Sequence, residues 1–160
     1  MSKAIKALHL IGVIMFFGSI LGHITVGLVP GVADDPNTAL FAREAIAVAT
    51  TYLTLPGLAL ALLSGIYMAA KRGGSVFRTR WLMLHALFGT VIVLNAALVL
   101  YPIGQELLEA ALQVAKGALP IDQLGDMAGR EAAFGAVNVV LCLVMVFVAV
   151  VKPRIGQPKL

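Results

Sequence analysis

Three histidines lie inside long apolar stretches of the sequence: His9, His23 and His85. A histidine within a membrane span is uncommon and is a candidate for function by default. Imidazole is an axial ligand of haem iron, and it also forms structural hydrogen bonds between membrane helices. The three residues therefore allow two interpretations, cofactor ligation and helix packing.

His9 and His85 are expected at the same depth in the bilayer. The first helix is expected to enter the bilayer near residue 6 and the third near Trp81, so each histidine should lie roughly 5 Å inside at 1.5 Å per residue. Two histidines at one level on two helices of a bundle can clamp a planar cofactor between them. Because the depths match, we favour ligation over packing here and predict one haem b whose iron is bound by His9 and His85.

His23 follows His9 by 14 residues, which is about 21 Å of helical rise and about 40° short of whole turns. The two histidines therefore share a helix face near opposite membrane surfaces, as ligands do in dihaem cytochromes b. The sequence has no fourth histidine to face His23. A second haem, with its iron five-coordinate or bound by a non-histidine partner, is one hypothesis for His23. A quinone contact or a proton relay is the other.

Small residues stand beside the two inner histidines. Gly12 follows His9 by three residues, and Gly89 follows His85 by four. Glycine permits close approach of a flat ligand to the backbone, so both are candidates for cofactor binding. Glycines equally allow membrane helices to pack closely with no cofactor.

Other polar residues have simpler explanations. Arg78 and Arg80 precede His85 closely and are candidates for pairing with haem propionates, although membrane topology also explains them. We expect Asn95 and Asn138 to hydrogen-bond between helices. A separate pair, Arg43 and Glu44, is expected to be solvated at the membrane boundary. Cys142 lies mid-helix and is expected to be a small core residue.

The chain is apolar enough for lipid to be its solvent. Of its 160 residues, 60% are hydrophobic and 12% are charged, whereas a soluble domain has about 25% charged residues. Lys, Arg, Asp and Glu are absent from residues 7–30, 45–70, 81–105 and 132–151. Each stretch exceeds the roughly 20 residues that cross a bilayer as a helix. We therefore predict an all-α membrane four-helix bundle that forms one domain over residues 1–160. Its predicted spans are about 7–29, 45–70, 81–101 and 132–151.

The distribution of charge predicts the orientation. Nine of the twelve Lys and Arg residues lie at the N-terminus, between the second and third spans, or at the C-terminus, and all eight acidic residues lie on the opposite side. The positive-inside rule then places both termini in the cytoplasm, and we predict a multi-pass protein of the bacterial inner membrane. The net charge of +4 follows from this rule, so no nucleic-acid partner is expected.

Punctuating residues predict where the helices end and bend. Pro30 and Gly31 should stop the first helix, Asp35 or Asn37 should cap the second, and Pro56 should kink it. Between the third and fourth spans, apolar residues recur at helical spacing: Leu107, Leu108, Ala111, Leu112 and Ala115. This pattern predicts a short helix lying on the periplasmic surface, stopped by Gly117 and Pro120.

Short motifs resemble a known group of membrane proteins. They are Lys6-Ala7-Leu8-His9, Pro56 with Gly65 nine residues later, and Trp81-Leu82-x-x-His85. Together they resemble HemJ-type proteins and the related small "predicted integral membrane protein" and copper-resistance CopD-like families, over the first three helices. HemJ members bind haem b and oxidise protoporphyrinogen. The resemblance implies that His9 is an axial haem ligand.

One departure from the HemJ pattern separates the functional hypotheses. His85 stands where that pattern has a lysine five positions into the Trp motif, which favours haem binding over protoporphyrinogen oxidation. The leading hypothesis is a membrane b-type cytochrome, in electron transfer or redox chemistry, with a quinone or another redox protein as partner and a homo-oligomeric state as a further expectation. The alternatives are a HemJ-like oxidase and a cofactor-free subunit or scaffold of a membrane complex. A copper role is the weakest, because the predicted periplasmic segments lack His and Cys and offer only Met127 as a soft ligand.

Overall fold

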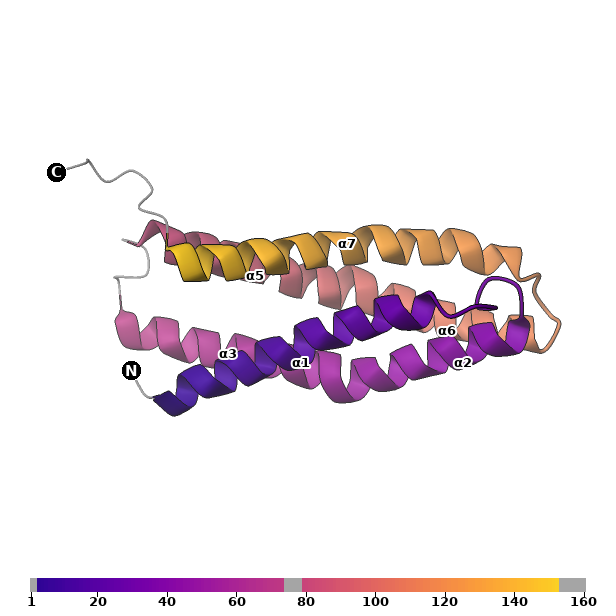
Figure 1. The fold of residues 1–160 in the computed structure, drawn as a ribbon, viewed down its shortest axis with the longest axis horizontal. Coiled ribbons are helices and arrows are strands. Elements are labelled where there is room, and N and C mark those ends of the chain that lie inside the picture. The colour runs from indigo at the N-terminus through magenta and orange to yellow at the C-terminus, as the bar shows by residue number, and fades with distance from the viewer. Residues whose placement is uncertain (1–2, 74–78, 153–160) are drawn as a thin grey trace.

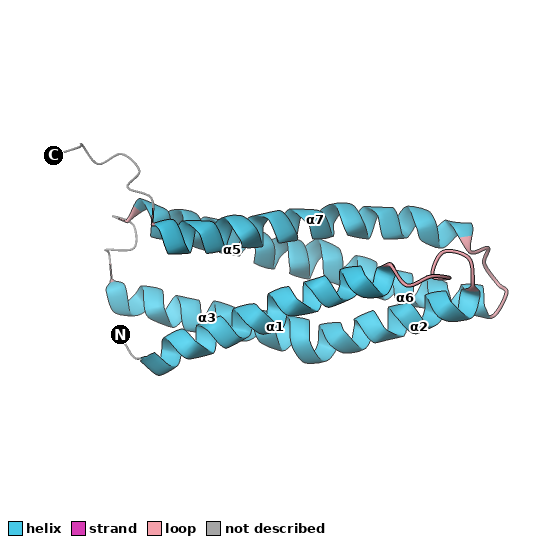
Figure 2. Ribbon diagram, in the orientation of Figure 1, coloured by secondary structure: helices cyan, strands magenta, loops and turns pink. Residues whose placement is uncertain are grey.

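The computed structural model describes residues 3–73 and 79–152, and these are helical almost throughout (Figure 2). The elements before the undescribed gap are α1 (Lys3–Gly27), α2 (Pro36–Ala49), η1 (Thr50–Thr54) and α3 (Leu55–Arg72). Those after it are α5 (Arg80–Asn95), η2 (Ala96–Leu100), α6 (Tyr101–Ala115) and α7 (Asp122–Val151). They join into four helices long and apolar enough to cross a membrane. The predicted all-α architecture is confirmed.

The bundle has two distinct ends (Figure 1). The start of α1, the end of α3, the start of α5 and the end of α7 lie together, and we call this the terminal end. The opposite, distal end carries the turns at residues 28–35 and 116–121. In the terminal half α1 packs on α3 and α5 packs on α7, whereas α6 packs on α2 and α7 in the distal half.

Two prolines interrupt long helices, and each is preceded by one π-helical turn. Pro56 has no N–H to donate to the helix, and in η1 the Leu55 N–H reaches back five residues to the Thr50 carbonyl. The η2 turn stands before Pro102 in the same way. The wider turn keeps the remaining backbone groups paired, which lipid requires. Figure 1 shows the chain changing direction between α2 and α3, as predicted for Pro56.

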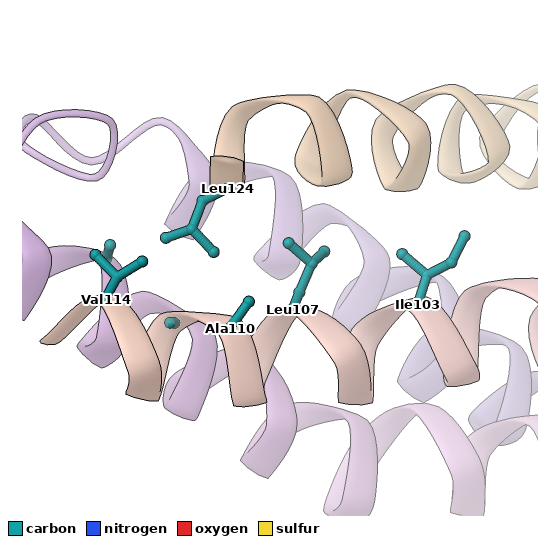
Figure 3. Close-up of a cluster of buried hydrophobic side chains, with 7 residues drawn as sticks. Ile103, Leu107, Ala110, Val114 and Leu124 are labelled. Atoms are coloured by element: carbon teal, nitrogen blue, oxygen red, sulfur yellow. The ribbon is translucent and has the colours of Figure 1, made fainter. Parts of the chain in front are cut away.

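The distal half contains the most tightly packed apolar core. Leu107 and Ala111 on α6 are fully buried, and Leu124 points from α7 toward α6 (Figure 3). The buried members of this core are Ala39, Ile103, Leu107, Ala110, Ala111, Val114 and Leu124. The helix expected after the third span is therefore present and ends before Gly117, whose φ is +72°. This helix, α6, continues the third span without a break, and its apolar face packs on α2 and α7. Protein rather than a lipid surface therefore covers that face.

The ends of α1 and α2 differ slightly from the sequence-based expectation. α1 ends at Gly27, before the expected stop, and the chain turns at Gly31, whose φ is +91°. Asp35, one of two expected caps, accepts hydrogen bonds from the Thr38 backbone N–H at 2.7 Å and hydroxyl at 2.6 Å. The side-chain hydrogen bond from Thr38, followed by the backbone one, lowers the pKa of the Asp35 carboxyl.

α1 and α3 cross with their backbones in contact. A Cβ at Gly12 would lie 2.5 Å from the Ala61 nitrogen and 2.8 Å from the Gly57 carbonyl oxygen. A Cβ at Gly57 would lie 2.6 Å from the Phe16 nitrogen. Only glycine allows this separation at either position. The crossing sets the distance between the two helices along the terminal half.

Gly12→Ala should destabilise the bundle by about 1–3 kcal/mol, because the added methyl group meets backbone that cannot move independently. The loss is measured as a lower midpoint of thermal unfolding in detergent. Gly18→Ala is the matched control, since a Cβ there has nothing within 4 Å. Equal effects of the two substitutions would contradict the close crossing.

Asp35→Ala should lower the thermal midpoint at neutral pH by removing the α2 cap. Because the folded-state pKa of Asp35 is depressed, its contribution is present above the ordinary value of 3.8 and is lost as the pH falls through the folded pKa. The midpoints of the parent protein and the variant should therefore converge below that pH. Asp34→Ala removes the preceding exposed carboxylate, which is not the cap of α2, and should leave the midpoint at neutral pH close to that of the parent protein.

Candidate functional site

His9 on α1 is held by two polar groups of α3. Its Nδ1 lies 2.9 Å from the Ala61 carbonyl oxygen and 3.1 Å from the Ser64 Oγ. A carbonyl oxygen only accepts hydrogen bonds, so Nδ1 carries the hydrogen. Nε2 therefore keeps its lone pair, which is the form of imidazole that binds a metal ion.

Ser64 and Gly65, two neighbouring residues of α3, allow His9 to contact that helix. Ser64 is buried, and its hydroxyl donates to the Leu60 carbonyl at 2.5 Å, so the serine is fixed to its own helix. A Cβ at Gly65 would lie 3.5 Å from the His9 Cε1, so the ring rests directly against the α3 backbone. α3 thus determines both the tautomer and the position of His9.

His85 lies on α5 opposite His9. The ring centroids are 6.4 Å apart, and the ring planes are inclined at 51°. The Nδ1 atom of His85 is buried and has no hydrogen-bond partner among the described residues, which is costly in apolar surroundings. The structure therefore brings together the two histidines that the sequence placed at one depth.

The two rings belong to different helix pairs. His9 comes from the α1–α3 pair and His85 from the α5–α7 pair, and among the described residues these two pairs come together mainly between α1 and α7. Fully buried apolar side chains are scarce here compared with the distal core, and Ile92 is the one on α5. The histidines thus face each other across the division between the two pairs.

The other predicted site residues lie in different surroundings. The Cβ direction of Gly12 is filled by α3, so its contact is with a helix rather than with a cofactor. Gly89 faces α7, with 3.5 Å between its Cβ position and the Met145 Cε. Arg80 is exposed at the first residue of α5, and Arg78 lies outside the described residues.

His23 meets hydroxyl groups rather than a second imidazole. Its Nε2 lies 3.3 Å from the Ser19 Oγ, and the Ser19 Oγ lies 2.7 Å from the Thr54 Oγ1 on η1. The Ser19 hydroxyl is also 3.4 Å from the Ala49 carbonyl oxygen. Ser19 is buried at 4% exposure, so these groups form a polar cluster between α1 and η1.

Arg43 pairs with Glu131 on α7, which corrects the expectation of a solvated pair with Glu44. The Arg43 guanidinium donates to the Glu131 carboxylate at 2.5 Å, and the two side chains are 11% and 25% exposed. Tertiary packing brings the N-terminal part of α7 to α2. Glu131, which is distant from Arg43 in the sequence, therefore becomes its partner in space.

Asn95 and Asn138 make interhelical hydrogen bonds, as expected for each, and the structure shows that they bond to one another. The Asn95 Nδ2 donates to the Asn138 Oδ1 at 2.9 Å and to the Phe134 carbonyl at 2.9 Å. Asn138 is 1% exposed, and its Nδ2 has no partner in the part of the chain that the structure describes. A buried amide with an unused donor was not foreseen from the sequence.

Sequence reasoning also missed Ser19, Ala61 and Ser64, the partners of the histidines on α1 and α3. Ser19 could have been found, because it precedes His23 by four residues and so shares its helix face. Ala61 and Ser64 carry no such signal, because their relation to His9 depends on how two helices cross.

A bare metal site of several side chains is not formed. Within residues 3–73 and 79–152, no three His, Cys, Asp or Glu side chains are grouped closely enough to hold an ion. Haem differs in its requirement, since the porphyrin supplies four nitrogens and the protein supplies only axial ligands. Cys142 is a half-buried free thiol in α7.

A surface groove of about 460 Å³ has none of the three histidines in its lining. It is lined by Phe41, Glu44, Ala45, Val48, Ala49, Tyr52 and Leu53 of α2 and η1. Phe41 and Tyr52 are 70% and 71% exposed, so the groove is an outward-facing apolar surface suited to lipid.

The four apolar helices and their buried polar contacts define a multi-pass integral membrane protein. Residues 3–153 match the family described as Predicted integral membrane protein (DUF2269), and the chain belongs to that family. No curated protein and no solved structure matches the chain. The resemblance to the small membrane-protein family is confirmed, and the resemblance to HemJ-type and CopD-like proteins stays a prediction.

Glu131→Gln should destabilise the protein by about 1–3 kcal/mol, because Arg43 is then left largely buried without its anion. Thermal unfolding in detergent measures the effect, and Glu44→Gln at the exposed neighbouring position is the control. Exchanging the two charges, with Arg43→Glu and Glu131→Arg together, should recover part of the loss. No recovery would show that the ion pair itself contributes little.

Proposed function

We propose that this protein is a membrane b-type cytochrome whose haem iron is bound axially by His9 and His85. The observation that carries the proposal is the 6.4 Å between the two ring centroids. Metal–imidazole bonds are about 2.0 Å, and each ring adds about 1.1 Å from nitrogen to centroid, so two axial imidazoles on one iron have centroids about 6 Å apart. The observed separation agrees with this requirement.

The hydrogen bonds of His9 support the same function. Histidines that bind a metal ion usually donate their second ring N–H to a carbonyl or carboxylate oxygen, which fixes the ring and raises its basicity. His9 has this arrangement through the Ala61 carbonyl and the Ser64 hydroxyl. This tautomer leaves the Nε2 lone pair available to an iron.

The environment of His85 supports ligation from the other side. A buried ring nitrogen without a partner costs about 1–3 kcal/mol, and Nδ1 of His85 is such an atom. A bond from Nδ1 to the haem iron would remove this cost, so Nδ1 is the ligand atom that we propose for His85. Since His85 comes from the α5–α7 pair, ligation would also tie the two helix pairs together.

When bound, haem b supplies a one-electron couple near the terminal end. The protein's part is to position two imidazoles and to exclude water, which needs no acid or base in the core, and the spans are free of Asp, Glu, Lys and Arg. By the positive-inside rule the terminal end faces the cytoplasm, so the haem would lie beneath the inner leaflet of a bacterial inner membrane. Arg80, at the start of α5, is placed to reach a propionate there.

The purified protein should show a Soret band, with pyridine haemochrome analysis giving one haem b per chain. His9→Ala and His85→Ala should each lower haem content at least tenfold or convert the spectrum from low-spin to high-spin. His23→Ala is the matched control and should leave the band unchanged, because His23 lies about 21 Å along α1 from His9.

A colourless protein that gains no Soret band on titration with hemin would overturn the proposal and favour a cofactor-free subunit. Loss of the band in His23→Ala but not in His9→Ala would move the haem away from the inner pair. Size-exclusion profiles of all three variants check that a lost band does not reflect unfolding.

A further inference from the structure

We infer that the terminal end of the bundle binds the headgroup of an anionic phospholipid. Trp81 of α5 and Lys152 of α7 form the centre of this site, and Lys71 of α3 is a second contact. The recognised group is a phosphodiester that carries one negative charge above two acyl chains. Lipid binding here does not depend on the proposed haem.

Lys152 and Trp81 are in contact across two helices. The Lys152 Nζ lies 5.9 Å from the centroid of the Trp81 ring, which is a cation–π contact. Trp81 is the second residue of α5, and Lys152 directly follows the last residue of α7. These two helix ends lie together at the terminal end (Figure 1). An ammonium group is therefore held beside an indole ring where the helices leave the apolar spans.

The backbone at Lys152 has an uncommon conformation. Its φ of +47° and ψ of +59° lie in the left-handed region, which residues other than glycine seldom adopt. No other non-glycine residue in the described part of the chain has a positive φ. The Lys152 N–H donates to the Val148 carbonyl at 3.0 Å, so this residue closes α7 where glycine is usually found. A lysine in this conformation is a reason to look for a function of its side chain.

Lys71 repeats this arrangement at the end of α3. Its Nζ lies 5.8 Å from the centroid of the Tyr67 ring, one turn earlier on the same helix. Tryptophan and tyrosine are enriched at the headgroup level of membranes. Lys71 and Lys152 are both exposed, and an ammonium group that rests on one ring face keeps N–H groups to donate elsewhere. Both lysines are thus available to a phosphate at that level.

The terminal end has basic side chains and no acidic ones. The sequence contains no Asp or Glu in residues 1–33, 45–105 or 132–160. The described basic residues at this end are Lys3, Lys6, Lys71, Arg72, Arg80 and Lys152. The anion that complements this charge must therefore come from outside these side chains, and juxtamembrane lysines attract anionic lipids.

Apolar surface continues from each lysine toward the middle of the membrane. Leu63 and Tyr67 precede Lys71 at four-residue spacing on one face of α3, and both are exposed. Val150, which precedes Lys152 by two residues on α7, is 75% exposed. A phospholipid matches this pattern, because its charged headgroup stands above acyl chains that cover such surfaces. Inorganic phosphate or an acidic protein would supply the charge alone.

Native mass spectrometry of the full-length protein, titrated with phosphatidylglycerol and separately with phosphatidylcholine of the same chains, tests this site. Phosphatidylglycerol should bind at least about fivefold more tightly, and Lys152→Ala should lower its affinity about fivefold, as expected for one lysine near an anionic headgroup. Lys152→Arg should retain most of the affinity, and adding Lys71→Ala to Lys152→Ala should remove the preference. Lys116→Ala is the matched control, because it removes an exposed positive charge at the distal end, and it should change nothing.

Equal binding of the two lipids would overturn the lipid site and favour an acidic protein at this end. A preference that Lys116→Ala lowers as much as Lys152→Ala does would show a general effect of charge, and would also overturn it. Displacement of phosphatidylglycerol by an equal concentration of inorganic phosphate would assign the lysines to a free anion instead. Thermal midpoints of the variants check folding, and Lys71→Ala alone replaces Lys152→Ala in the comparison if the latter lowers its midpoint.

Discussion

The close crossing of α1 and α3 at Gly12 and Gly57 is the contact on which the candidate site depends. Because neither residue has a side chain, the two backbones touch, and the Ala61 carbonyl and Ser64 hydroxyl come within hydrogen-bond distance of His9. A wider crossing would leave the His9 ring without its α3 partners. The orientation of the His9 ring toward His85 therefore results from the packing of α1 on α3 over two to three turns, and not from a local sequence motif.

The prolines divide the bundle into two halves with different character. At η1 the helix changes direction, so that α3 packs against α1 in the terminal half, whereas α2 packs against α6 in the distal half (Figure 1). The distal half is closed by a packed apolar core and by the Arg43–Glu131 ion pair. The terminal half consists of two helix pairs with a histidine on each. The packed apolar core is therefore at one end of the bundle, and the candidate cofactor ligands are at the other.

Buried polar groups occur at two levels, and helix periodicity links them. On α1, His9, Phe16 and His23 are spaced by seven residues and share one face, with buried Phe16 between the two polar levels. On α7, Glu131, Asn138 and Met145 follow the same spacing. Lipid offers no hydrogen-bond partner to a polar side chain. Polar residues that recur on the inward face of a membrane helix therefore need partners on neighbouring helices.

The sequence by itself determined the four helices, their approximate spans and the matched depth of His9 and His85. These features follow from hydrophobicity and from the fixed rise of a helix, both of which are local properties. Only the tertiary structure decided that Gly12 contacts α3, that Arg43 pairs with Glu131 rather than with its neighbour Glu44, and that the helix before Gly117 continues the third span. It also decided that Asn138 keeps an unpaired donor. Each of these contacts depends on how the helices are rotated about their axes. The hydropathy of the sequence does not determine that rotation.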